Sequence, residues 1–231
     1  MSSADHIVYL VDDDPGLREA LTDLLCLSGF NAVAFGSAAE YLVYPAPELP
    51  GCLILDVHLP DINGLEFQRQ LGTTSHAPII FITGYGDIPT SVRAIKAGAL
   101  DFLTKPFSDE ALLQAVAAAI DQDGKALRER ADLAELKARH ASLTLREREV
   151  LALIVAGLLN KQAAAELGIS EVTLQIHRSN GMRKMGAGCL AELVRFAARL
   201  EVAIPSVQGR RRLDGEGSSA PLPRLRDRTP R

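Results

Sequence analysis

The feature that most constrains this chain is the apolar run 52–55, which ends on Asp56. A run this short cannot span a membrane and has the length of a buried strand in a parallel sheet. The segment after it, 59–64, contains the proline, asparagine and glycine of a loop. In an open parallel sheet, ligands bind beyond the carboxyl ends of the strands. Asp56 is therefore expected at the floor of a site, although a single aspartate in this position can also do no more than begin a turn.

Four more short apolar runs alternate with helical patterns in the first half of the chain. The runs cover residues 7–11, 32–35, 78–82 and 99–104, and the last helical pattern covers 109–120. Proline, serine or glycine stands at the boundaries of the helical patterns, as it does at helix ends in general. Five strand–helix repeats predict an α/β fold with a doubly wound, five-stranded parallel sheet.

Polar residues stand where four of these runs end, namely Asp12 with Asp13, Asp56, Thr83 and Lys105. Because parallel strands end at one edge of the sheet, these side chains are expected to meet there. Carboxylates held together repel one another, so a cation must offset their charge. Oxygen ligands with room for water suit Mg²⁺, and a hydroxyl and an ammonium opposite the metal suit phosphoryl oxygens. This set of groups favours phosphoryl transfer, with Asp56 as the nucleophile.

The charge of the chain divides near residue 124. Residues 1–124 carry 17 acidic and 5 basic side chains, a formal charge of −12, whereas residues 125–231 carry 12 and 20, a formal charge of +8. A basic half indicates an anionic partner. The sequence contains no basic membrane-lying helix, no secretion signal and no membrane-spanning run, so nucleic acid is the expected partner and the cytoplasm the expected location.

A helical joint is expected between the two halves. Residues 121–124 are predicted to interrupt the helical pattern, which resumes over 125–140 with a narrow apolar stripe between charges spaced for pairing. The stripe is shorter than the three or four heptads that indicate a coiled coil. It is left open whether this stripe packs on a domain face or on a partner chain.

The second half predicts a small all-α domain. Thr144 and Glu147 match a capping box at the start of one helix. Asn160 is expected to cap a short helix that ends at Gly168, and Ser170 is expected to cap the next one. Two helices joined by a tight, glycine-containing turn predict a helix-turn-helix, which places its second helix in the major groove of DNA.

The second helix of this pair supplies the candidate DNA contacts, except for Lys161, which lies on the first helix. Its inward-facing side chains are expected to be Leu174, His177 and Met185. Gln175, Ile176 and Ser179 are then left to face base edges, where glutamine can pair with adenine and isoleucine can contact a thymine methyl group. The candidates for phosphate contacts are Lys161, Thr173, Arg178, Arg183 and Lys184. Each of the basic residues can equally be a solvated surface charge.

Four segments of the first half share residue types and spacing with one known family. They are Val11-Asp12-Asp13, the stretch from Leu55 to Gly64, Thr83-Gly84-Tyr85-Gly86-Asp87 and the stretch from Phe102 to Phe107. On these segments the first half resembles the receiver domain of bacterial two-component response regulators. The resemblance implies a sheet with strand order 2-1-3-4-5 and transfer of a phosphoryl group from a sensor histidine kinase to Asp56.

The resemblance also assigns roles to the other residues of the edge. It implies that Mg²⁺ is held by Asp12, Asp13, Asp56 and the backbone carbonyl of His58. It implies that the phosphoryl group is bound by Thr83 and Lys105, that Phe102 is an aromatic switch, and that the peptide bond before Pro106 is cis. The His58 side chain receives no role.

Residues of the second half match a second family. Arg146 to Leu151, Gly157, Asn160-Lys161 and Thr173 to Arg178 resemble the LuxR-type DNA-binding domain. With the receiver, the whole resembles the NarL/FixJ class of regulators. The expected division is a receiver over 6–121, a helical linker over 122–140, a LuxR-type domain over 141–203 and a disordered basic tail over 204–231.

Gly181 departs from the pattern of this second family. It stands in the recognition helix where an aliphatic residue is usual, and we expect it to interrupt that helix. Glycine costs about 1 kcal/mol there in helix propensity. The sequence therefore predicts a DNA-binding domain that is marginally stable alone or that folds fully only in a dimer or on DNA.

The resemblance implies a transcriptional regulator and not an enzyme. Phosphorylation of Asp56 would lead to receiver dimerisation and promoter binding. The implied partners are double-stranded DNA, a sensor histidine kinase, RNA polymerase and a second copy of the chain. Two alternatives stay open, a phosphorylation-independent DNA binder whose receiver serves only to dimerise and an aspartyl-phosphate phosphatase. The phosphatase is suggested by the aspartates 12–14 after a strand, which resemble the start of haloacid-dehalogenase-like enzymes.

Overall fold

The computed structural model describes residues 6–45, 47–72, 77–84 and 88–201. The chain forms two compact units that divide between Asp132 and Leu133. The expected disordered tail, 204–231, lies outside the described residues. Within the described ranges, no helix is both long and apolar enough to cross a membrane.

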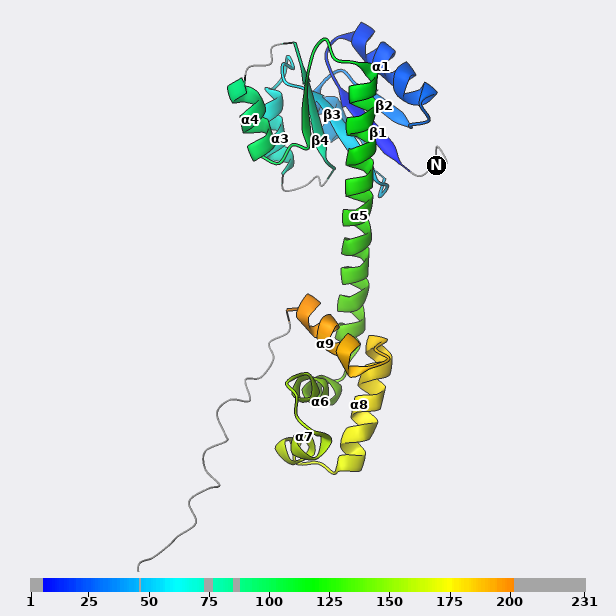
Figure 1. The fold of residues 1–231 in the computed structure, drawn as a ribbon, viewed down its shortest axis with the longest axis vertical. Helices are drawn as coiled ribbons and strands as arrows, with labels where there is room; N and C mark the ends of the chain where they lie inside the picture. The colour runs from blue at the N-terminus through cyan, green and yellow to red at the C-terminus, as the bar shows by residue number, and fades with distance from the viewer. Residues whose placement is uncertain (1–5, 46, 73–76, 85–87, 202–231) are drawn as a thin grey trace, which may run out of the picture. The chain divides into compact units, whose positions relative to one another are not determined.

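The first unit contains a parallel sheet of five strands (Figure 1). The strands are β1 (Ile7–Val11), β2 (Ala32–Phe35), β3 (Gly51–Asp56), β4 (Ile79–Thr83) and β5 (Asp101–Thr104). Their order is β2-β1-β3-β4-β5, as the resemblance to receiver domains implied. β5 begins two residues later than expected, and β4 extends to include Thr83.

Helices cover both faces of this sheet. They are α1 (Pro15–Leu27), α2 (Ala38–Leu42), α3 (Gly64–Leu71), α4 (Ile88–Lys96) and α5 (Asp109–Ala141). Alternate residues of β1 enter two different cores, with Tyr9 in the core under α2, α3 and α4 and Leu10 in the core under α1 and α5. Because β1, β3 and β4 are buried on both sides, they are continuous apolar runs and not alternating ones.

The helix α5 does not break where the sequence suggested. It runs without interruption from Asp109 to Ala141, so the expected interruption at residues 121–124 is wrong. Asp123 is buried, and its Oδ2 accepts a hydrogen bond of 2.9 Å from the backbone N–H of Gly51 at the start of β3. Gly124 lies beside Pro50. These contacts hold the helix on the sheet at the point where its local sequence favours a turn.

The second unit is helical. Its helices after α5 are α6 (Leu145–Val155), α7 (Asn160–Leu167), α8 (Glu171–Met185) and α9 (Leu190–Arg199). The predicted capping box is confirmed, because Thr144 Oγ1 accepts from the Glu147 N–H at 3.2 Å and Glu147 Oε2 accepts from the Thr144 N–H at 2.8 Å. Leu174 and Met185 of α8 are buried as expected, whereas His177 is half-buried.

Two expectations about this unit are wrong. Asn160 does not cap α7 but is its first residue, and the cap is Leu159, whose N–H donates to Gln162 Oε1 at 3.0 Å. Gly181 does not interrupt α8, which is continuous through it. A Cβ at Gly181 would lie 2.9 Å from Leu151 Cδ1, so the Leu151 side chain of α6 fills the space that an aliphatic residue would occupy.

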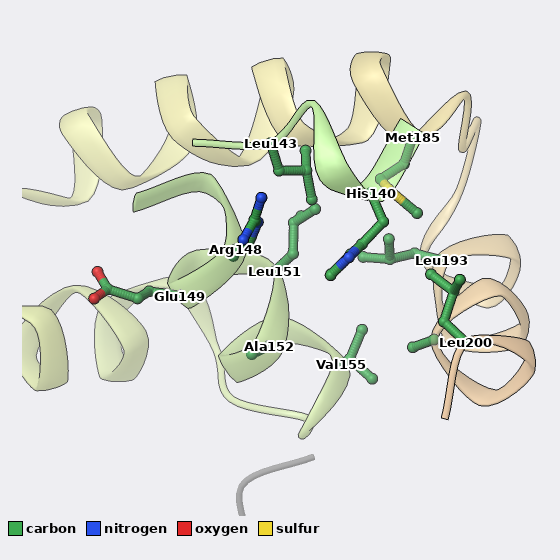
Figure 2. A pocket seen from close by; sticks show the side chains of 11 residues that line it. His140, Leu143, Arg148, Glu149, Leu151, Ala152, Val155, Met185, Leu193 and Leu200 are labelled. Carbon is green, nitrogen blue, oxygen red and sulfur yellow. The ribbon is translucent and has the colours of Figure 1, made fainter. Parts of the chain in front are cut away.

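An apolar cavity of about 300 Å³ lies between the end of α5, α6 and α9 (Figure 2). Leucine, valine and methionine side chains form most of its wall, and His140 and Arg148 also line it. Burial, and secondarily the charge of Arg148, lower the pKa of His140. The neutral imidazole is therefore the form favoured in the folded unit.

Candidate functional site

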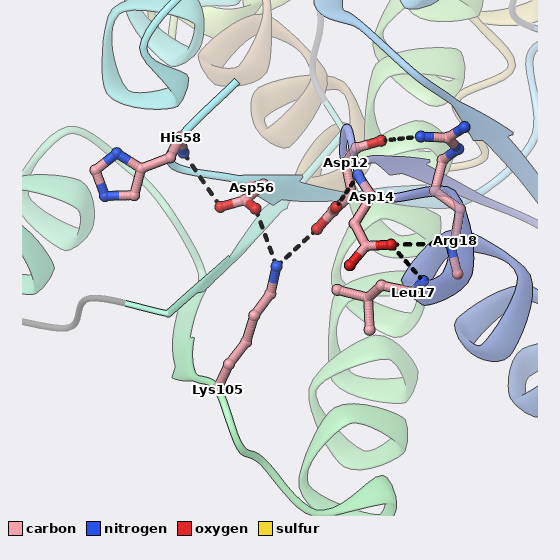
Figure 3. A network of polar contacts seen from close by, with 8 residues as sticks. Asp12, Asp14, Leu17, Arg18, Asp56, His58 and Lys105 are labelled. Atoms are coloured by element: carbon pink, nitrogen blue, oxygen red, sulfur yellow. Dashed lines mark hydrogen bonds and ion pairs between the residues drawn. The ribbon is translucent and has the colours of Figure 1, made fainter. Parts of the chain in front are cut away.

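The predicted acidic cluster forms at the carboxyl edge of the sheet (Figure 3). Lys105 Nζ lies 2.7 Å from Asp12 Oδ2 and 2.9 Å from Asp56 Oδ2. Asp12 is 0% exposed and Asp56 is 7% exposed. The neighbouring strands β1 and β3 bring the two carboxylates together, and β5 brings Lys105 to the same edge.

Backbone groups fix both carboxylates. The N–H of Asp14 donates to Asp12 Oδ1 at 2.9 Å, and the N–H of His58 donates to Asp56 Oδ1 at 3.1 Å. Arg18 donates from Nη1 to the backbone carbonyl of Asp12 at 2.7 Å. Each buried carboxylate thus uses one oxygen for Lys105 and the other for a backbone amide, as buried charges require.

The sequence analysis did not predict the roles of Asp14 and Arg18 in this cluster. Asp14 caps α1 by accepting from the N–H groups of Gly16 and Leu17, and its own N–H binds Asp12. The signal was present in the sequence, because an aspartate before a proline is a typical helix start. Arg18, four residues later on that helix, returns to the same loop.

Burial and mutual contacts shift the pKa values of Asp12 and Lys105 in this cluster. Burial raises the pKa of Asp12, and the hydrogen bond from Lys105 opposes this rise. Burial acts to lower the pKa of Lys105, but the hydrogen bonds to Asp12 and Asp56 outweigh it and the pKa is raised. Lys105 is therefore protonated at neutral pH, with its ammonium group between two carboxylates.

The same carboxylates fit a hard cation. One oxygen each from Asp12, Asp13 and Asp56 lies within 4.8 Å of the others, and Asp13 is exposed while its two partners are buried. Three oxygen donors with one open side are the environment that Mg²⁺ prefers in proteins. Lys105 offsets part of the negative charge of Asp12 and Asp56.

The remaining residues of the edge lie around this cluster. Thr83 is buried at the end of β4, and its carbonyl accepts from the Lys105 N–H at 2.7 Å. Phe102 is half-buried, with its ring 6.3 Å from that of Phe81. The peptide bond between Lys105 and Pro106 is cis, as expected. His58 is exposed, and Figure 3 shows its imidazole turned away from Lys105.

The predicted DNA-facing side chains fall into two groups. Gln175, Ile176 and Ser179 are exposed on α8, and Ile176 retains 56% of its surface although it is aliphatic. The exposed basic candidates are Lys161 and Arg183. The half-buried candidates are Thr173, Arg178 and Lys184.

Internal contacts engage these half-buried candidates. Lys184 Nζ lies 2.7 Å from Oε2 of Glu147, whose side chain is buried. Thr173 Oγ1 lies 2.8 Å from the Ser170 hydroxyl, and Arg178 Nη1 donates to Asn160 Oδ1 at 2.7 Å. None of these partners was predicted, because each pair joins residues whose contact depends on how the helices pack or on the cap geometry of α8.

Comparison with known proteins assigns both units. Residues 8–117 match the response regulator receiver domain, and residues 141–197 match the luxR family of bacterial regulatory proteins. The chain is 47% identical to nodulation protein W of Bradyrhizobium diazoefficiens over 203 residues, which cover 87% of this chain and 89% of that protein.

This chain is a response regulator of the NarL/FixJ class. It is also 43% identical to the transcriptional regulatory protein FixJ of Azorhizobium caulinodans, over 85% of this chain and 93% of FixJ. Among solved structures, the response regulator StyR superposes with a TM-score of 0.78 at 44% identity, over 85% of this chain and all of StyR. This response regulator thus combines a receiver with a LuxR-type DNA-binding domain.

Proposed function

We propose that Asp56 of this response regulator accepts a phosphoryl group from the phosphohistidine of a sensor kinase. The observation that carries the proposal is the buried Asp12–Lys105–Asp56 cluster, which presents one carboxylate at an edge with an adjacent cation. Mg²⁺ held by Asp12, Asp13, Asp56 and the carbonyl of His58 would supply charge neutralisation to the phosphoryl oxygens.

The residues of the cluster support an in-line transfer. A carboxylate oxygen of Asp56 attacks phosphorus as the bond between phosphorus and the kinase imidazole nitrogen breaks, and the imidazole leaves with a proton from solvent. Lys105 remains bound to Asp12 while its contact with Asp56 passes to a phosphoryl oxygen. The Thr83 hydroxyl then moves to bind another phosphoryl oxygen, and Phe102 turns inward into the space that this movement opens.

We further propose that phosphorylation favours a homodimer through the α4 and β5 face of the receiver. Val92 and Ile95 of α4 are both more than 40% exposed there, which gives an apolar surface to bury. Phosphorylation would shift a pre-existing equilibrium toward this dimer, so some activity is expected without it. Paired α8 helices would then bind adjacent half-sites of promoter DNA and act on RNA polymerase.

The test is intact mass and oligomeric state with Mg²⁺ and acetyl phosphate. Wild type is expected to gain a phosphoryl group and dimerise, whereas Asp56→Asn does neither. Asp61→Asn is the matched control, because Asp61 is an exposed aspartate outside the cluster that binds the Ala39 N–H. Phosphoryl gain by Asp56→Asn contradicts the proposal, and so does the absence of a phosphoryl gain in both proteins.

A second measurement distinguishes the proposal from the alternative in which the protein binds DNA independently of phosphorylation. A target duplex is first selected from randomised DNA with the full-length protein. Phosphorylated wild type is expected to bind it more tightly than Asp56→Ala. Equal affinity would mean that the receiver acts in this protein without phosphate control.

A further inference from the structure

Two asparagine–arginine hydrogen bonds occur on α8, and they differ in kind. Arg178 Nη1 donates to Asn160 Oδ1 at 2.7 Å, and this bond joins α8 to the first residue of α7. Arg183 Nη2 donates to Asn180 Oδ1 at 3.2 Å, and this bond is exposed and lies within one helix. The first bond therefore fixes a guanidinium relative to two helices, whereas the second does not.

The fixed guanidinium lies at the predicted DNA-facing surface. One shallow hollow on the second unit is lined by Asn160, Gln175, Arg178 and Ser179, and Arg183 also lines it. Gln175 and Ser179 are exposed there, whereas Arg178 is half-buried. Arg178 is thus drawn toward α7, while its neighbours on α8 are left facing outward.

The beginning of α7 adds a second source of positive potential. Its cap is Leu159, whose aliphatic side chain cannot accept a hydrogen bond from the amides of the first turn. Those N–H groups have no acceptor within an α-helix, and the helix dipole makes this end favourable for an anion. Arg178 uses one donor for Asn160, and a guanidinium carries several more.

We propose that Asn160 is a positioning residue for DNA binding, which directs the Arg178 guanidinium onto one backbone phosphate beside the first turn of α7. This inference rests on the proposed DNA binding of the second unit. It assigns Arg178 to the phosphate that sets the register of α8, and it leaves base edges to Gln175, Ile176 and Ser179. Asn160 itself acts through Arg178.

The test is a double-mutant cycle in the full-length protein. Asn160→Ala, Arg178→Ala and the double variant are titrated with a random-sequence duplex and with the selected duplex at several salt concentrations. Arg178→Ala is expected to weaken binding to both duplexes about tenfold and to reduce the salt slope by about one. Asn160→Ala is expected to weaken both about threefold to tenfold and to add nothing to Arg178→Ala.

Asn180→Ala is the matched control, because it removes the other asparagine–arginine bond. It is expected to change affinity less than about twofold, because that bond is exposed and lies within one helix. Asn160→Ser replaces Asn160→Ala if the alanine variant melts below wild type, and the same loss of affinity is expected.

Three results would overturn the inference. They are wild-type affinity for Asn160→Ala, additive effects in the double variant, and an Arg178→Ala loss confined to one base pair with an unchanged salt slope. Failure of the wild type to bind any duplex would instead overturn the proposed DNA binding, and the two failures are therefore distinguishable.

Discussion

The receiver edge and the DNA-facing surface differ in how far their functional side chains are buried. At the receiver edge, Asp12 and Asp56 are almost completely buried and share one cation. On α8, the candidate readers of DNA are exposed side chains on an unbroken helix. A buried cluster allows little change, because each charge depends on the others. An exposed face can change its side chains at low cost to the fold, as a surface that must suit one DNA sequence requires.

The largest effect is expected at the shared cation. Lys105→Met leaves two buried carboxylates without their partner, so we expect the free energy of unfolding in EDTA to fall by about 2–3 kcal/mol. Addition of Mg²⁺ should reduce this loss, because the metal would replace part of the missing charge. Urea denaturation with both conditions measures it. An unchanged urea midpoint in EDTA would mean that Lys105 does not stabilise the two buried carboxylates.

An apolar contact in the second unit should rank next. Gly181→Leu would force Leu151 aside, and overpacking of this kind costs about 2 kcal/mol. Combining it with Leu151→Ala should cost clearly less than the sum of the two single changes, because the new side chain fills the space that leucine leaves. Additive losses in thermal denaturation would contradict the assigned packing.

The anchor of α5 tests whether a buried carboxylate away from the site behaves like those in it. Asp123→Ala leaves the Gly51 N–H without its acceptor, so we expect a loss of about 1–2 kcal/mol in stability. Hydrogen exchange at the Gly51 amide should accelerate. Asp121→Ala is the matched control, because it removes an exposed pair with Lys125 worth less than about 0.5 kcal/mol. Equal losses of stability for the two variants would contradict the role of Asp123 in anchoring α5.

The smallest effect on stability is expected at Glu147. This acid is buried although it belongs to the second unit, so it is an exception to the comparison between the two regions. The hydrogen bond from Lys184, with the Thr144 cap, lowers the pKa of Glu147. Its contribution is then complete above the unfolded pKa of about 4.3 and is lost as pH falls through the lower folded pKa. We expect Glu147→Gln to cost about 1 kcal/mol at pH 7 and progressively less below pH 5 or so. Denaturation of both proteins across this pH range checks it, and a pH-independent difference would contradict the ionic origin.

Much of the first unit followed from its sequence. The apolar runs and their boundary residues predicted the five strands, and the sheet edge then brought Asp12, Asp56 and Lys105 together. The errors occurred where a local signal competes with a tertiary contact. Residues 121–124 favour a turn locally, but Asp123 and Gly124 pack against the start of β3 and the helix continues.

The sequence by itself determined the alternation of strands and helices, the capping box at Thr144, and the residue types that stand at the sheet edge. These depend on periodicity and on contacts between near neighbours in the chain. Only the tertiary structure decided that Gly181 receives Leu151, that Lys184 pairs with Glu147 and that Arg178 binds Asn160. Each of these contacts joins two helices, and the packing of helices is not encoded in the spacing of residues along either one.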